Sequence, residues 1–182
     1  MCIRDRWIGS HDGIAQVVED KAVLVEENHD ASKMMSFGKD VFFLSGTGTI
    51  SLKREGEDSR IVTRLGEGSK VYSTMRLQND WIVFTEDGSY VFNLKTHQVS
   101  LDTELNIKKG QVQIDNRGNF WIYNHTGKVW YVNAKTRFVK SFQLIPADKV
   151  NYIDEERYHI VHDSRAVSYT HLRAHETELH LV

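Results

Sequence analysis

The chain has 182 residues, with 23 Lys and Arg against 25 Asp and Glu, a formal net charge of −2 and 40% hydrophobic residues. This balance gives no electrostatic reason to expect a nucleic acid or an anionic membrane as a partner. No apolar run approaches the roughly 18 residues of a membrane span, and the single cysteine, Cys2, excludes internal disulfides and multi-thiolate metal sites.

The two ends of the chain are expected to be translated sequencing adapter. Met1–Asp5 can be back-translated as ATG TGT ATA AGA GAC, and the reverse complement of this DNA encodes Val167–His171. A transposase-based library leaves such inverted copies at both ends of a fragment. We therefore expect residues 1–6 and 167–182 to be adapter-derived, and the fold is predicted for residues 7–166.

A series of similar units fills residues 7–166, with expected boundaries at 7–35, 36–70, 71–106 and 107–150 and the start of a fifth unit at 151–166. In each unit an aromatic-rich strand is followed by a glycine-containing turn and a second strand, which is the pattern of a β-hairpin. The positions that mark the repeat are Trp7, Gly13, Phe43, Gly48, Trp81, Gly88, Asp115, Gly118, Trp121 and Gly127.

The units repeat with a period close to 40 residues. A shift of 40 places Trp81 on Trp121, Asn93 on Asn133, and Lys95-Thr96 on Lys135-Thr136. An all-strand repeat of this length is typical of the blades of a β-propeller. The prediction is an all-β, incomplete β-propeller, with about four antiparallel four-stranded blades in an arc and little helix.

Two packing rules follow from the repeat. Side chains alternate between the faces of a strand, so we expect each blade to place its Trp or Phe against the next sheet. The turn glycines, including Gly13 and Gly88, are expected to adopt the positive φ that hairpin turns need. In the fifth unit Tyr158–Arg165 matches the run up to Arg117, so its aromatic residue is expected near position 169.

The repeats resemble those of the two-component regulator propeller family. That repeat reads approximately as Asp, two residues, Gly-Asn, an aliphatic residue and Trp-Ile-Gly-Thr, and the closest matches here are Asp115–Ile122 and Trp7–Ile14. In place of the small Gly-Thr pair the chain has Tyr123-Asn124. The resemblance implies the extracytoplasmic, hence periplasmic, sensor of a hybrid histidine kinase that detects oligosaccharides. The motif residues are scaffold, so the resemblance identifies no ligand-binding position.

Several histidines have spacings that invite a metal or acid–base interpretation. His171 and His175 have the i, i+4 spacing of two ligands on a helix, but adapter translation explains them. His159 and His162, beside Asp163, are interpreted as the edge of a blade. We therefore predict no catalytic residue, no metal site and no cofactor.

Other polar residues are interpreted as parts of turns or as surface. Asp12, Asp87 and Asp115 lie in separate turns, where aspartate is common, and nothing pairs two of them. The pairs Lys53-Arg54 and Lys108-Lys109 are predicted to be solvated surface. Asn124-His125-Thr126 matches the glycosylation acceptor pattern, which is frequent by chance.

The functional prediction is a sensor fragment without catalytic residues that binds an oligosaccharide and belongs to a protein that forms homodimers. Exposed aromatic side chains near the ends of a propeller channel suit stacking on sugar rings. The alternatives are a propeller enzyme, such as a polysaccharide lyase or a quinone-dependent dehydrogenase, and a protein-interaction propeller. An enzyme would need titratable groups that converge in the channel, and this distinguishes it from a sensor.

Overall fold

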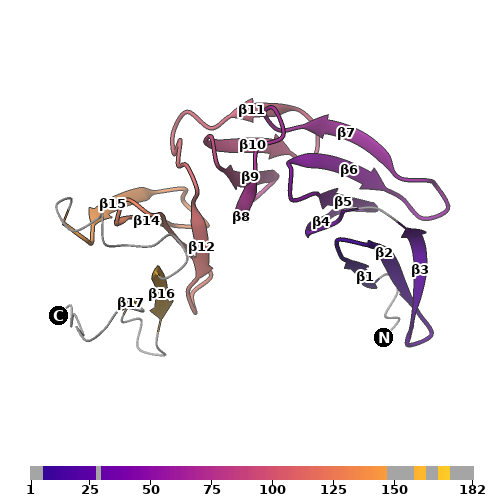
Figure 1. Cartoon of the computed structure of the whole chain (residues 1–182), viewed down its shortest axis with the longest axis horizontal. Coiled ribbons are helices and arrows are strands. Elements are labelled where there is room, and N and C mark those ends of the chain that lie inside the picture. Colours follow the sequence, from indigo (N-terminus) through magenta and orange to yellow (C-terminus); the bar gives the residue numbers. More distant parts are fainter. Residues whose placement is uncertain (1–5, 28–29, 147–157, 163–167, 173–182) are drawn as a thin grey trace.

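The computed structural model describes residues 6–27, 30–146, 158–162 and 168–172, and every regular element in these ranges is a β-strand. The strands form one three-stranded sheet, three four-stranded sheets and one further strand pair. The sheets follow one another along an open arc, with the first strand of each sheet on the inner side and the last on the outer side (Figure 1). The predicted all-β, incomplete propeller is confirmed.

Within each sheet, every strand pairs antiparallel with its neighbours in sequence. The first sheet contains β1 (Arg6–Gly9), β2 (Gly13–Val18) and β3 (Lys21–Glu27). The second contains β4 (Lys33–Phe37), β5 (Asp40–Leu44), β6 (Thr49–Lys53) and β7 (Arg60–Arg64). The third contains β8 (Val71–Leu77), β9 (Asp80–Thr85), β10 (Ser89–Asn93) and β11 (Val99–Leu101). The fourth contains β12 (Gln111–Ile114), β13 (Phe120–Tyr123), β14 (Lys128–Val132) and β15 (Val139–Gln143).

The last strand pair consists of β16 (Tyr158–His162) and β17 (Ser168–Leu172). Val161 pairs with Tyr169, the position at which the interrupted fifth unit was expected to place its aromatic residue. The expected boundary between the first two units, at 35/36, falls inside β4, so the second sheet begins at Lys33. The other blade boundaries and the adapter assignment stay predictions.

The outer turns of the third and fourth sheets reproduce the 40-residue repeat in atomic detail. The side-chain oxygen of Asn93 accepts hydrogen bonds from the backbone N–H groups of Lys95 and Thr96, at 3.1 and 2.9 Å. Asn133 does the same for Lys135 and Thr136, at 3.0 and 2.9 Å. These asparagines therefore stabilise the turn locally, which is why its sequence recurs.

The core lies in the contact layers between neighbouring sheets, here called seams. The seam between the first and second sheets contains Ile14, Ala31 and Phe43, with Trp7 packed against them. The seam between the second and third sheets buries Phe42, Leu44, Ile50, Leu52, Leu65, Trp81, Val83, Phe92 and Leu94. The seam between the third and fourth sheets buries Met75, Leu77, Ile82, Phe84, Ile107, Phe120, Ile122 and Val132. Each sheet is thus stabilised by apolar burial against its neighbours.

The expectation that every Trp or Phe of the repeat faces the next sheet is wrong for two of the four. Trp7 packs on Phe43 of the second sheet, as expected, but Phe43 thereby faces the preceding sheet. Trp81 also faces the preceding sheet, whereas Trp121 lies on the face of its sheet that is turned away from the third sheet. Trp81 and Trp121 are therefore not equivalent, although they lie 40 residues apart.

A difference of one residue in loop length explains this inversion. In the third sheet Phe84 pairs with Ser89, whereas in the fourth Tyr123 pairs with Val129. The loop between β13 and β14 is therefore one residue longer than the loop between β9 and β10. When the outer turns of the two sheets are aligned, Val132 is equivalent to Phe92. Phe92 pairs with Trp81, whereas Val132 pairs with Phe120, the residue before Trp121. A slip of one residue moves a side chain to the opposite face of a sheet.

The expectation of positive φ is also wrong for Gly13 and Gly88. Gly48, Gly118 and Gly127 do have positive φ, of 82°, 79° and 70°. Gly13 serves a different purpose, since a Cβ atom at this position would lie 2.3 Å from the carbonyl oxygen of Glu26. It permits the close approach of β3 beside the register shift between Ile14 and Ala15.

Candidate functional site

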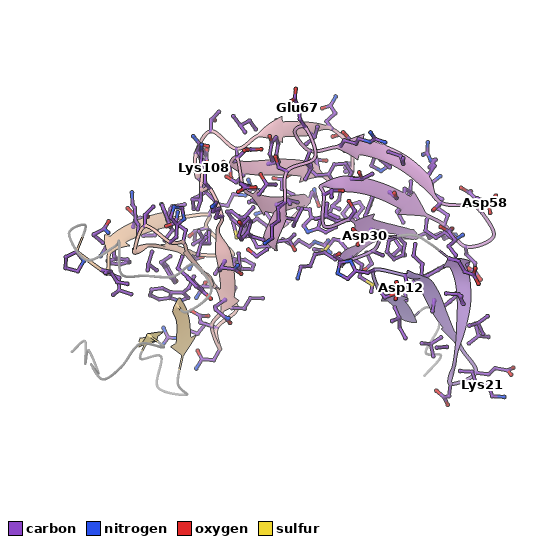
Figure 2. The ribbon with its side chains drawn as sticks, viewed as in Figure 1. Asp12, Lys21, Asp30, Asp58, Glu67 and Lys108 are labelled. Carbon is purple, nitrogen blue, oxygen red and sulfur yellow. The ribbon has the colours of Figure 1, made fainter. Side chains whose placement is uncertain are left out.

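Polar side chains connect the loops at the ends of the first two sheets. The carboxylate of Asp30 accepts a hydrogen bond of 2.7 Å from the N–H of Gly46 in the second sheet and one of 2.6 Å from the hydroxyl of Ser32. Figure 2 places Asp30 and Asp12 near the inner side of the arc, while Lys21 and Asp58 mark its outer rim. Asp30 thus fastens the connection between the sheets to the next loop.

His11, Asp30 and Ser32 lie together at this end of the arc, but their geometry does not form a catalytic triad. The Nδ1 atom of His11 is 3.2 Å from Asp30 and 3.5 Å from the Ser32 hydroxyl. A triad needs the serine and the carboxylate on opposite ring nitrogens, so that the imidazole can accept the serine proton. Here both approach the same nitrogen and the serine donates to the aspartate, so the hydroxyl is not activated as a nucleophile.

Of the other predicted aspartates, Asp115 supports its own turn, whereas Asp87 binds the connection that precedes β8. Asp115 accepts hydrogen bonds from the N–H groups of Arg117 and Asn119, at 2.9 and 2.8 Å, and from the indole of Trp121 at 3.3 Å. Asp87 accepts a hydrogen bond from the hydroxyl of Ser69. Among the described residues no group of three or more His, Cys, Asp or Glu could hold a metal ion.

An ion pair that the sequence did not reveal joins the first and second sheets. Lys53 Nζ lies 2.5 Å from Glu26 Oε1, and the Lys53 side chain is only 6% exposed. The same carboxylate accepts hydrogen bonds from the N–H and the hydroxyl of Ser59. The prediction that Lys53 belongs to a solvated pair is therefore wrong, because β3 of the neighbouring sheet covers it.

A second kind of polar contact is repeated between the later sheets. In the outer turn of the third sheet His97 lies 3.7 Å from Asp40 of the second sheet, and in the fourth sheet Arg137 lies 2.6 Å from Asp80 of the third. His97 and Arg137 both have a φ of 60°, which directs this turn position toward the preceding sheet. Arg54 also binds Asp40, at 2.6 Å. The contacts of His97 and Arg137 therefore join neighbouring sheets, whereas Arg54 binds an aspartate of its own sheet.

One cavity among the described residues lies between the first and second sheets and has a volume of about 590 Å³. The Trp7 ring in its wall is held edge-to-face against Phe43, with a centroid distance of 6.2 Å. This volume is in the range of small-molecule pockets, and an indole beside hydroxyl and charged groups is typical of sugar sites. The wall is formed by Trp7, Ser36, Gly38, Lys39, Val41, Arg54, Glu55 and Glu57.

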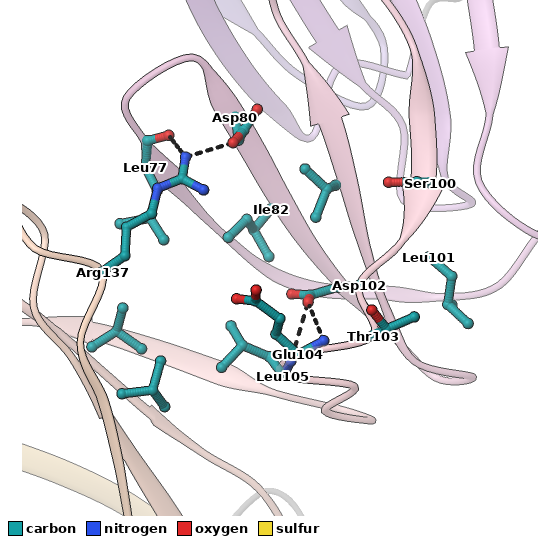
Figure 3. Close-up of a pocket in the computed structure, with 13 residues that line it drawn as sticks. Leu77, Asp80, Ile82, Ser100, Leu101, Asp102, Thr103, Glu104, Leu105 and Arg137 are labelled. Atoms are coloured by element: carbon teal, nitrogen blue, oxygen red, sulfur yellow. Dashed lines mark hydrogen bonds and ion pairs between the residues drawn. The ribbon is translucent and has the colours of Figure 1, made fainter.

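Another, smaller cavity, of about 230 Å³, lies between the third and fourth sheets. Figure 3 shows Arg137 reaching Asp80 and the carbonyl of Leu77, while Asp102 accepts hydrogen bonds from the N–H groups that follow it. Its charged groups are largely engaged in joining the sheets and closing a turn. The cavity near Trp7 is therefore the stronger candidate for ligand binding.

The remaining sequence motifs, the glycosylation pattern and the histidine pairs, form neither a modification site nor a metal site among the described residues. Asn124 is buried, and its amide donates to the carbonyl of Lys108 at 3.1 Å, which leaves no room for a glycan. His159 and His162 lie in β16 and His171 lies in β17, so His171 is not helical. Asp163 and His175 fall outside the described residues. No helix among the described residues could cross a membrane.

Acid is expected to weaken the sheet contacts. Burial would raise the pKa of Glu26, but hydrogen bonds from Lys53 and Ser59 outweigh it and lower the pKa. Asp30 shows the same balance, and the bond from Arg54 lowers the pKa of Asp40. A carboxyl whose pKa is lowered by folding contributes stability above its unfolded value, and this stability is lost as the pH falls through the folded value.

We therefore predict that the free energy of unfolding is nearly constant at neutral pH and falls below about pH 4. Urea denaturation at a series of pH values measures this dependence. The Glu26→Gln variant should be less stable at neutral pH and should lose less stability on acidification than the unaltered chain. An unchanged acid slope in this variant would show that Glu26 does not contribute.

Comparisons with known proteins show the fold. No protein-family model and no curated protein matches the sequence. The extracellular domain of BT3049 from B. thetaiotaomicron, described as a hybrid two component system, matches with a TM-score of 0.61 and 17% identity over 92% of this chain. The extracellular domain of BT4673 from the same organism, described likewise, matches with a TM-score of 0.59 and 9% identity over 94%.

A third solved structure with this fold is an enzyme. Catalytically inactive virginiamycin B lyase from Staphylococcus aureus, solved with quinupristin, matches with a TM-score of 0.53 and 11% identity over 86% of this chain. The chain spans 24% and 25% of the two extracellular domains and 61% of the lyase. The likeness to the extracellular domains is consistent with the resemblance seen in the repeat sequence.

Proposed function

We propose that the chain is part of the extracytoplasmic, ligand-sensing propeller of a hybrid two-component histidine kinase, and that it binds an oligosaccharide. Two features support this proposal: the repeat resembles that of such sensors, and the fold is shared with extracellular domains described as parts of hybrid two component systems. The proposed protein would act in the periplasm and signal to transcription as a homodimer. The fragment itself would carry no catalytic step.

The observation that carries the binding proposal is the cavity near Trp7. A flat indole can stack on the apolar face of a pyranose ring, while hydroxyl and charged side chains bind the sugar hydroxyls. The Trp7 ring is fixed by Phe43, so its orientation costs little entropy on binding. Ser36, Lys39 and Glu55 in the same wall provide a hydroxyl, a donor and an acceptor.

Calorimetric titration of the 182-residue chain with a panel of oligosaccharides tests this proposal. At least one oligosaccharide should bind, and the Glu55→Gln and Lys39→Gln variants should bind it roughly tenfold more weakly, the effect of losing one charge-assisted hydrogen bond. The matched control is Glu19→Gln, because Glu19 lies in the exposed turn between β2 and β3. Binding that all three variants retain would place the ligand elsewhere.

The enzyme alternative is tested on the same samples. The lyase with this fold and the cluster of His11, Asp30 and Ser32 motivate the experiment. Incubation with the polysaccharides from which the panel derives should release no new reducing ends and no unsaturated sugar. Turnover that is lost in the His11→Ala variant would replace the sensor proposal with a catalytic one.

A further inference from the structure

The inner side of the seam between the second and third sheets, formed by β4 and β8, combines cations with an aromatic ring. Neither strand contains an Asp or a Glu. Met35 and Phe37 of β4 pack against the core of this seam. Because side chains at every second strand position share a face, Lys33 lies on the same face, and it is exposed.

The facing strand β8 contributes Thr74 and Arg76 to the same seam. Ser73 donates to the carbonyl of Gly110 in the connection to the fourth sheet, and Met75 belongs to the core shared with that sheet. Alternation therefore turns Thr74 and Arg76 toward the second sheet. Arg76 confirms this direction, since its Nη1 donates to the carbonyl of Ser36 at 3.1 Å.

A β-bulge lies at the start of β8, where Lys70, the residue that precedes the strand, contacts the ring of Tyr72. The register shifts between Val71 and Ser73, so Tyr72 occupies the extra position. Bulges re-aim side chains and recur next to binding sites. The Nζ atom of Lys70 lies 5.2 Å from the centre of the Tyr72 ring, and Lys70 is exposed. Two carboxylates that lie close to Lys70 have other partners: Glu86 lies 3.7 Å from Lys109, and Asp87 accepts a hydrogen bond from Ser69.

From this arrangement we propose that the inner side of this seam binds the carboxylate of an acidic sugar, a uronate unit within the oligosaccharide. Tyr72 would stack on the ring of the unit, while Lys70 and Lys33 bind its charge. The proposal rests on the proposed oligosaccharide-sensing function and specifies the class of ligand. It also adds a contact site distinct from the cavity near Trp7.

The test compares two ligands that differ only at the carboxyl group, which is charged in one and methyl-esterified in the other. The 182-residue chain is titrated with trigalacturonate and with its fully methyl-esterified form, in which the sugar rings are the same. The acid form should bind roughly tenfold more tightly, as expected for one or two charge-assisted hydrogen bonds, and added salt should reduce the difference. The Lys70→Gln and Lys33→Gln variants should each lose most of the preference.

Two controls separate charge from structure. Lys95→Gln removes an exposed lysine from the outer turn and should leave the preference unchanged. Tyr72→Leu should weaken both ligands by the same factor, because stacking does not depend on the carboxylate. Equal binding of acid and ester, or a preference that survives Lys70→Gln and Lys33→Gln together, would overturn the inference.

The titrations also distinguish failure of the uronate site from failure of the sensor proposal. If a neutral oligosaccharide of the panel binds but trigalacturonate does not, the sensor proposal stands and the uronate site is refuted. If no saccharide binds at all, both proposals fall.

Discussion

Replacing Trp81 by alanine is expected to lower the free energy of unfolding by about 3 to 5 kcal/mol, the range for removing a large buried aromatic side chain. Trp81 is fully buried in the seam between the second and third sheets. Its indole N–H has no hydrogen-bond partner among the described residues, so the cost arises from lost packing alone. Urea denaturation followed by circular dichroism measures the change.

Trp121→Ala is the matched control, since the repeat sequence makes the two residues look equivalent. Trp121 is only partly buried and packs against Tyr131 and Phe142 of its own sheet, on the face turned away from the third sheet. Its replacement should cost less than half as much. A Trp81→Phe variant should cost about 1.5 kcal/mol or less, because it keeps most of the apolar area and removes an unsatisfied donor. Equal losses at Trp81 and Trp121 would contradict the assignment of faces.

The sequence predicted the sheets well because the signals for strands and turns are local. Asn93 and Asn133 each stabilise a turn through hydrogen bonds to residues two and three positions away, so a short stretch of sequence is enough to predict the turn. The face of the sheet on which an aromatic residue lies is harder to predict from a short stretch of sequence. It depends on counting every residue between two strands, and one extra residue in the loop before β14 inverts it.

The contacts between sheets were beyond a sequence prediction for a related reason. Lys53 and Glu26 are 27 residues apart and lie in different sheets, and neither position belongs to the repeat motif. Lys53 is the last residue of β6, and nothing in the sequence around it predicts that a neighbouring sheet covers its side chain. The cavity near Trp7 likewise forms from strands and loops of the second sheet that meet a strand of the first.

This hidden pair leads to the second large expected effect. Glu26→Ala should lower the free energy of unfolding by about 2 to 4 kcal/mol, slightly less than for a fully buried pair because Glu26 is 18% exposed. The loss arises mainly because the Lys53 side chain, which is 6% exposed, would be left without the carboxylate that compensates it. The hydrogen bonds from Ser59 to the same carboxylate would also be lost.

Two further variants distinguish an uncompensated charge from lost packing. Glu27→Ala alters the adjacent exposed carboxylate and should change the stability by about 0.5 kcal/mol or less. The double variant Glu26→Leu with Lys53→Met removes both charges and keeps the volume, and such replacements of buried pairs are often neutral. It should therefore recover most of the stability that Glu26→Ala loses, as measured by urea midpoints at neutral pH. If the double variant is as unstable as Glu26→Ala, the carboxylate acts through Ser59 and the ion pair contributes little to joining the first two sheets.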